Sequence, residues 1–393
     1  MHRAIVFTCV LLAVGHKAIT APAPDGEDNL EEISDEDKQI LLENCNKQEG
    51  GCNPDLEEYK KEREEVEGIL VNELEFEEGI PEEEAKKEVE ERLQKIQELK
   101  TLIHAEMGIP EIPPANDGLF EGDIILTKEQ AQEMIDEIKG KAKRAASYFF
   151  EKESNKKYLW SMPIHYWVDT SVMTQGQQDK VHEALQIMEQ AVPCLAFERD
   201  DAPLKSGSQM QFYSEGEGCG GFSPLGHEGI NRVIILADEE SSCNGDMLIG
   251  TVIHEVIHSL GGDHEQTRTD RDKYVEILWK NIDPEFEYAY HKFNGSTSYG
   301  VPYDYKSVMH YYNGGFAMPK GSLTMEVLQS PDGEETTLGS WTMTDNDILQ
   351  LKRMYCSTCE DTSANCGIQV LNGGCDAGDA QTQCPRSCGQ CDE

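Results

Sequence analysis

The segment HEVIHSLGGDHE at residues 254–265 constrains this chain more than any other stretch of its sequence. Side chains four residues apart lie on one face of an α-helix, so His254 and His258 can direct both imidazoles at one point. Gly261 permits the positive φ that turns a chain out of a helix, and His264 would then return as a third nitrogen ligand. Three protein ligands around an open position are typical of catalytic zinc. We therefore predict a zinc site here.

Glu255 lies beside the two helical histidines in the H-E-x-x-H pattern and is predicted to act as general base toward a water molecule. The alternative interpretation is a core helix whose histidines are only packed. In a chain with 11 histidines among 393 residues, H-E-x-x-H arises by chance in about 3 of 100 chains. Adding the glycine and the third histidine lowers this to roughly one in ten thousand. The spacing therefore favours the metal site.

These residues resemble the metzincin metalloproteases, in which the extended zinc motif is followed by a turn that contains methionine. The segment SVMHY supplies that methionine, Met309, as a packed floor beneath the site. Within this clan the chain resembles the astacin family, over residues 120–356. The resemblance is carried by Glu265 after the third histidine, RTDRDKYV at 268–275, VPYDYKSVMHY at 301–311 and LKRMYC at 351–356. One departure is Gly262, where the family usually has phenylalanine.

The resemblance implies a catalytic domain over residues 145–356, with an α+β fold of two subdomains around a deep active-site cleft. It implies one zinc ion per chain, bound by the three histidines, with Glu255 as base in the hydrolysis of peptide bonds in extracellular proteins. Tyr311 would ligate the resting zinc and move away to stabilise the oxyanion. The alternative for Tyr311 is a packed aromatic side chain.

The distribution of apolar residues also indicates an α+β domain. Alternating patterns predict strands, and apolar residues at helical spacing predict helices. The predicted strands cover residues 162–169, 208–213 and 231–236, and the predicted helices cover residues 179–192 and 247–260.

The segment before this domain is an acidic propeptide, assigned to residues 21–144. Residues 31–100 are rich in Glu and Lys and have only a thin apolar stripe, so we expect a charged, mobile or loosely helical leader without a packed core. The basic island KGKAKRAAS suits a trypsin-like or furin-like activating protease. Cleavage after Arg144 would make Ala145 a new N-terminus.

Two further roles follow from the resemblance. FEGD at residues 120–123 matches the F-x-G-D motif of astacin propeptides, which implies that Asp123 binds zinc in the zymogen only. A carboxylate is a competent zinc ligand, and Gly122 lets the backbone approach closely. Glu265 would form a buried ion pair with the amine of Ala145, which exists only after cleavage.

The N-terminal segment, residues 1–20, has the layout of a secretory signal peptide, whose end falls between residues 18 and 23. Its apolar run is too short to span a bilayer, and no later segment is apolar enough. A formal net charge of −41 argues against nucleic acid or anionic membrane as a partner. We expect a secreted, extracellular protein, with storage in a secretory or venom organelle left open.

Cysteine parity supports export, because removal of Cys9 with the signal leaves an even number. The astacin resemblance implies the disulfides Cys194–Cys356 and Cys219–Cys243. Leftover parity suggests Cys45–Cys52. Residues 359–391 resemble a ShK-toxin-like module, which implies the pairs Cys359–Cys391, Cys366–Cys384 and Cys375–Cys388, whereas sequence alone leaves fifteen pairings open.

This tail lacks both Lys and Tyr, so we interpret it as a module that docks substrate or target rather than a channel blocker. Asn294 begins a glycosylation sequon.

The rival hypothesis is a binding protein or toxin that acts through the tail and uses the protease domain as a scaffold. A further alternative is another metzincin subfamily, such as the matrix type. The substrate is left open, with venom, digestive and developmental roles all compatible.

Overall fold

The computed structural model describes residues 33–48, 51–54, 56–77, 79–140, 158–214, 219–237, 245–292, 298–328, 336–356 and 385. Several predicted features lie outside these residues: the signal peptide, the cleavage point at Arg144 and Ala145, Cys243, Asn294, and the three cysteine pairs of the tail. Among the described residues, no helix is both long enough and apolar enough to cross a membrane.

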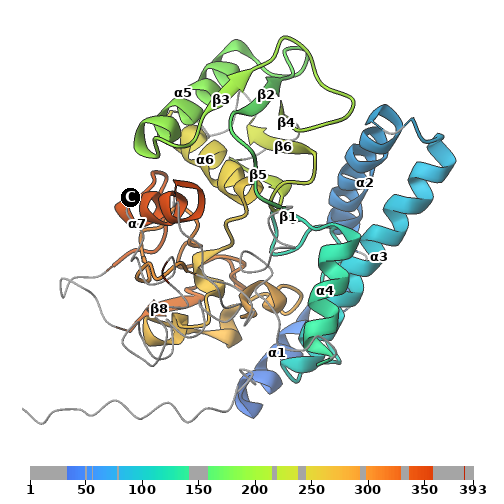
Figure 1. Ribbon diagram of the computed structural model, residues 1–393. Coiled ribbons are helices and arrows are strands. Elements are labelled where there is room, and N and C mark those ends of the chain that lie inside the picture. Colours follow the sequence, from blue (N-terminus) through green and yellow to red (C-terminus); the bar gives the residue numbers. More distant parts are fainter. Residues whose placement is uncertain are drawn as a thin grey trace, which may run out of the picture.

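A six-stranded mixed sheet forms the upper part of the molecule, with the strand order β1-β5-β6-β4-β2-β3 (Figure 1). The strands are β1 (Ile124–Ile125), β2 (Ile164–Val168), β3 (Phe197–Arg199), β4 (Gln209–Ser214), β5 (Cys219–Pro224) and β6 (Ile230–Ala237). Only the β5–β6 pair is antiparallel. The strands predicted at residues 162–169, 208–213 and 231–236 correspond to β2, β4 and β6. β5 was not predicted, because its sequence CGGFSP has no apolar alternation.

Two helices pack against this sheet, α5 (Gln175–Ala191) and α6 (Asp246–Leu260). Thr174 begins α5 with a capping box, in which its hydroxyl accepts from the Gln177 backbone N–H and the Gln177 side chain bonds back. The buried side chains of α5 recur at helical spacing and join the strand residues in one apolar core. Both helices lie where the sequence predicted them.

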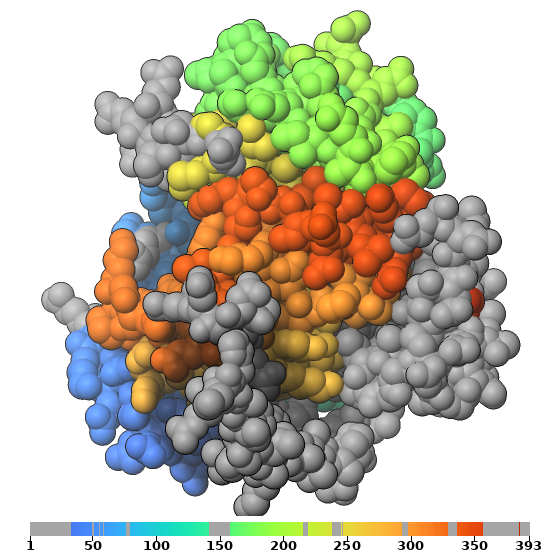
Figure 2. All heavy atoms as spheres, turned by 90° about the vertical axis from the view of Figure 1, so that its left-hand side faces the viewer, coloured from blue at the N-terminus to red at the C-terminus, as the bar shows by residue number. Residues whose placement is uncertain are grey.

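The lower part of the molecule is built mainly from short turns of helix and irregular chain. Its regular elements are η2 (Glu265–Thr267), η3 (Arg271–Lys273), β7 (Val275–Ile277), η4 (Trp279–Asn281), η5 (Glu287–Tyr290), β8 (Met325–Val327), α7 (Asp345–Leu351) and η6 (Lys352–Cys356). β7 and β8 form a two-stranded antiparallel sheet. The face in Figure 2 shows residues of this part, in orange and red, directly below the green residues of α5 and its neighbours.

The leader is packed, and the prediction of a loosely helical leader without a core is wrong. It forms α1 (Asp35–Lys47), α2 (Glu57–Glu77), α3 (Glu82–Glu106) and α4 (Lys128–Ile138). One apolar side chain on nearly every turn of α3 is fully buried: Ala85, Val89, Leu93, Ile96, Leu99 and Ile103. A stripe this narrow suffices because α2, α4 and the lower part of the molecule cover it in one continuous apolar cluster.

Disulfides connect segments in both halves of the chain. Cys194 is bonded to Cys356, which joins the end of the α5 region to the last turn of the described domain. Cys45 is bonded to Cys52 within the leader. Cys219 is also disulfide-bonded.

Candidate active site

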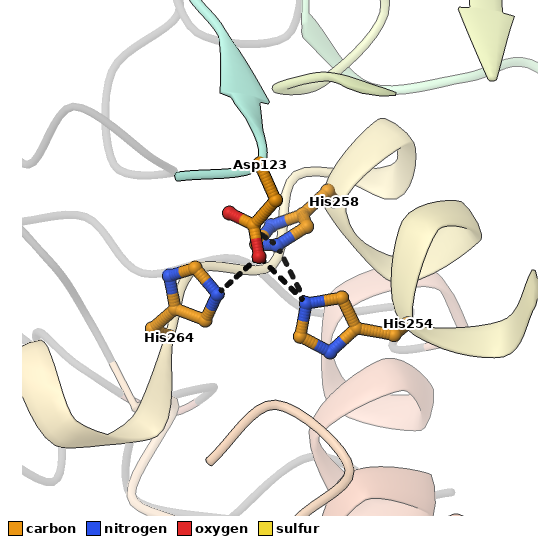
Figure 3. Close-up of side chains that lie close together, drawn as sticks. All are labelled: Asp123, His254, His258 and His264. Atoms are coloured by element: carbon orange, nitrogen blue, oxygen red, sulfur yellow. Dashed lines mark hydrogen bonds and ion pairs between the residues drawn. The ribbon is translucent and has the colours of Figure 1, made fainter. Parts of the chain in front are cut away.

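The helix α6 carries His254 and His258 and ends at Leu260, directly before Gly261. Gly261 adopts a left-handed conformation with φ of 99°, which residues with a side chain rarely adopt. The Gly262 N–H then donates to the Ile257 carbonyl at 2.8 Å and closes the turn. The chain reverses direction within three residues and brings His264 back beside His254 and His258 (Figure 3).

Each of the three imidazoles has its Nδ1 atom committed to an oxygen acceptor. The three Nδ1–O distances are all 2.8 Å, to Val308 O from His254, to Gly262 O from His258 and to Glu121 Oε2 from His264. An Nδ1 that faces an oxygen acceptor carries the proton, so Nε2 is the ring nitrogen left to bind a metal. This arrangement fixes the tautomer that a metal ligand needs.

The three Nε2 atoms converge on one point together with the carboxylate of Asp123. The Nε2 atoms of His254 and His258 lie 3.0 Å apart, and Asp123 Oδ2 lies 3.3 Å from His254 and 3.1 Å from His264. His258 Nε2 lies 3.7 Å from Asp123 Oδ1. Tetrahedral zinc with bonds of 2.0–2.1 Å separates its ligand atoms by about 3.3 Å. The donor set and its spacing therefore fit zinc with three nitrogen ligands and one oxygen ligand.

The electrostatics of the cluster also call for a cation. Burial lowers the pKa of His264 to about 4 and also lowers the pKa of His258, so both imidazoles are neutral near pH 7. Burial works to lower the pKa of His254 as well, but the Asp123 hydrogen bond and the Glu255 charge outweigh it and raise the pKa to about 9. A buried proton there supplies the positive charge that a zinc ion would supply instead.

Glu255 is held next to this cluster by the strand β5. Its side chain is 2% exposed, and its Oε2 accepts from the Ser223 hydroxyl at 2.9 Å. A Cβ added at Gly221 would lie 2.7 Å from the Glu255 Cγ, so glycine is required to make room for the carboxylate. Burial raises the pKa of Glu255 to about 8, and a bound cation would favour its charged form. Sequence reasoning identified Glu255 but not Ser223 or Gly221.

Tyr311 lies against the cluster, and its hydroxyl is bound by the leader. Its ring centroid is 4.6 Å from that of His264. The Tyr311 hydroxyl donates a short hydrogen bond to the Glu121 carbonyl, and burial raises its pKa well above the ordinary value. Met309 is buried, and its carbonyl accepts from the Glu265 N–H at 3.0 Å.

Glu265 is already paired in this structure. Its Oε1 accepts from Arg268 at 2.9 Å and from the Asp304 N–H at 2.7 Å. Burial raises the pKa of its carboxyl to about 7. Its expected partner, the amine of Ala145, lies outside the described residues.

The leader enters the site as an added strand. β1 pairs in parallel with β5, and the Ser223 N–H donates to the Asp123 carbonyl at 2.9 Å. Gly122 has φ of 84°, and a Cβ there would lie 2.6 Å from Phe316 Cζ, so any other residue would strain the backbone and displace the Phe316 ring. Glu121, which sequence reasoning missed, bonds to both His264 and Tyr311. No sequence signal pointed to it, because a glutamate in so acidic a leader is expected to be exposed.

A sequence model of the peptidase family described as Astacin matches residues 152–356, just over half of the chain. The chain belongs to the astacin family. This astacin is 30% identical over 303 residues to zinc metalloproteinase nas-9 of Caenorhabditis elegans, covering 71% of the chain and 54% of the relative. It is 33% identical over 250 residues to zinc metalloproteinase dpy-31 of the same nematode, covering 62% and 40%. The chain thus spans about half the length of the first of these relatives and less of the second.

Among solved structures, the chain is similar to high choriolytic enzyme 1, a hatching enzyme zinc-protease from the medaka fish Oryzias latipes. The TM-score is 0.45 at 25% sequence identity, and the match covers 53% of this chain and 98% of the enzyme.

Proposed function

We propose that this astacin is a secreted zinc endopeptidase that hydrolyses peptide bonds in extracellular proteins and is made as a zymogen. The observation that carries this proposal is the convergence of the Nε2 atoms of three histidines and one leader carboxylate beside a buried glutamate. When bound, zinc supplies a Lewis acid that polarises a carbonyl and acidifies water. His254, His258 and His264 would hold one such ion.

The side chains of this chain supply the rest of the chemistry. Glu255 would accept the proton of the attacking water and pass it to the leaving amine. Glu255 is buried beside the three histidines and accepts from the Ser223 hydroxyl, which places its carboxylate to take a proton and return it. Tyr311 would donate its hydroxyl proton in a hydrogen bond to the developing oxyanion, once the hydroxyl is free of Glu121.

Latency would come from the leader. Asp123 would occupy the metal position that water needs, and β1 would fill the edge of the sheet beside β5. Cleavage after Arg144 by a trypsin-like or furin-like protease would release both contacts. The new Ala145 amine would then pair with Glu265, whose buried carboxyl lacks a full countercharge of its own because Arg268 is shared with Asp270.

Location and accessory binding belong to the same proposal. The predicted signal peptide directs the chain out of the cell, and the ShK-toxin-like tail would dock substrate or target. The rival hypothesis of a binding protein on a protease scaffold is disfavoured by Glu255, since a scaffold needs no buried base.

The test measures hydrolysis of a peptide library by the full chain and by the chain trimmed after Arg144. We expect hydrolysis only after trimming, lost on chelation and restored by zinc. Glu255→Gln should keep one equivalent of zinc but lower hydrolysis by about a thousandfold, whereas Glu276→Gln on the exposed face of β7 should not. Substantial activity in the trimmed Glu255→Gln variant would contradict the mechanism. Zinc binding without any hydrolysis after trimming would move the function to the tail.

A further inference from the structure

The backbone of Tyr311 is clamped at both of its polar groups. Its N–H donates to Gln266 Oε1 at 3.1 Å, and its carbonyl accepts from His310 Nδ1 at 2.8 Å. Both partner side chains are buried, with 0% and 3% exposure for Gln266 and His310. The backbone of Tyr311 is therefore held on both sides, whereas its hydroxyl is bound solely to a leader carbonyl among the described residues.

The clamp at the carbonyl depends on a second tyrosine. The hydroxyl of Tyr303 lies 2.7 Å from His310 Nε2. Because Nδ1 of His310 must donate to a carbonyl, Nε2 is the accepting nitrogen and the Tyr303 hydroxyl is the donor.

The ring of Tyr303 is itself held on its faces. It stacks on Tyr274, with centroids 4.6 Å apart and planes inclined by 5°, and the Arg268 guanidinium lies 5.3 Å from its centroid. Arg268 also donates to Glu265, the residue that the proposed function pairs with the new N-terminus. The side chain that holds His310 in place is thus itself packed between Tyr274 and Arg268, next to Glu265.

We propose that Tyr303 and His310 are positioning residues for Tyr311 in peptide hydrolysis, an inference that rests on the proposed function. A hydrogen-bond donor stabilises an oxyanion well only when its position is fixed before the reaction. Tyr311 must leave Glu121 and reach the oxyanion by rotation about its side-chain bonds, so its backbone has to stay in place. The Tyr303–His310 pair holds that backbone through the carbonyl.

The experiment measures kcat and KM of the trimmed enzyme after the hydrogen bond between Tyr303 and His310 is removed by the smallest possible substitution. Tyr303→Phe removes one hydroxyl and keeps the stack on Tyr274. We expect kcat to fall about tenfold with KM nearly unchanged. Tyr305→Phe is the matched control, because the Tyr305 hydroxyl bonds to the Tyr274 carbonyl and not to His310. His310→Asn keeps a donor near the Nδ1 position and should retain more kcat than His310→Leu.

Repeating Tyr303→Phe in a Tyr311→Phe background distinguishes a general structural role of Tyr303 from a role that acts through the Tyr311 hydroxyl. If Tyr303 acts through the Tyr311 hydroxyl, kcat of the double variant should equal that of Tyr311→Phe alone. An equal fall in both backgrounds, or no fall in kcat for Tyr303→Phe, would overturn this inference and leave the proposed function intact. Full kcat in Tyr311→Phe would overturn the role of Tyr311 and this inference together. Zinc content and thermal unfolding of each variant confirm that the site is assembled.

Discussion

Replacing the buried Lys100 with methionine should lower the free energy of local opening of the leader more than a lysine-to-methionine substitution at an exposed position. Lys100 lies in α3 and is fully buried. Its Nζ donates to Asp117 Oδ1 at 2.5 Å and to the Ala115 carbonyl at 3.0 Å, and it lies 4.5 Å from the ring centroid of Tyr288 in η5. Burial lowers the pKa of Lys100 and the Asp117 charge acts to raise it, so the buried ammonium and the buried carboxylate depend on each other.

The magnitude follows from what the substitution leaves behind. Methionine keeps the length and apolar stem of lysine, so the loss of packing is small. Asp117 is left at 2% exposure with the Leu119 N–H, at 3.1 Å, as its remaining hydrogen-bond donor among those described. Removing one partner of a buried ion pair costs about 3–5 kcal/mol. At about 1.36 kcal/mol per factor of ten, the open population of the leader should rise by roughly 10²- to 10⁴-fold.

The assay is hydrogen exchange of the amides of α3 in the uncleaved chain, which reports the free energy of local opening. Lys95→Met is the matched control in the same helix. Lys95 pairs with Glu98 at 2.7 Å, with side chains 23% and 41% exposed, and such a pair contributes about 0–1 kcal/mol. An opening free energy for Lys100→Met no lower than that for Lys95→Met would refute the reasoning.

Three other predictions concern the site and the leader. Asp123→Ala in the uncleaved chain should raise hydrolysis of a peptide at least about tenfold, because the metal position opens to water; an unchanged rate would contradict the proposed latency. Gly221→Ala should lower kcat of the trimmed enzyme about 100-fold, because the added Cβ would lie 2.6 Å from the Ile234 carbonyl and 2.7 Å from the Glu255 Cγ and would displace β5 and Glu255 from each other. Gly220→Ala, where a Cβ meets nothing within 4 Å, should not. Burial lowers the pKa of His104 from 6.5 to about 4, so its contribution to stability is present above pH 6.5 and is lost as the pH falls toward 4. Relative to the His104→Asn variant, the unfolding free energy of the wild type should drop by up to about 3 kcal/mol over that range, measured by urea denaturation. The same pH dependence of the unfolding free energy in both proteins would rule this out.

The sequence determined the three-histidine part of the candidate site because its geometry is local. Helical spacing alone places His254 and His258 on one face, and Gly261 alone permits the turn that returns His264. The helix and the three main strands of the sheet were likewise predictable from periodicity. These features depend on neighbouring residues and on backbone preferences that each residue carries with it.

Only the tertiary structure decided what surrounds those ligands. Glu121 lies 143 positions from His264, and Ser223 lies 32 positions from Glu255, yet each pair is in hydrogen-bond contact. The narrow stripe of α3 became a core only because other elements cover it. No local pattern encodes such contacts, since they arise from packing between distant segments, where the burial of a whole face outweighs the propensity of any single residue.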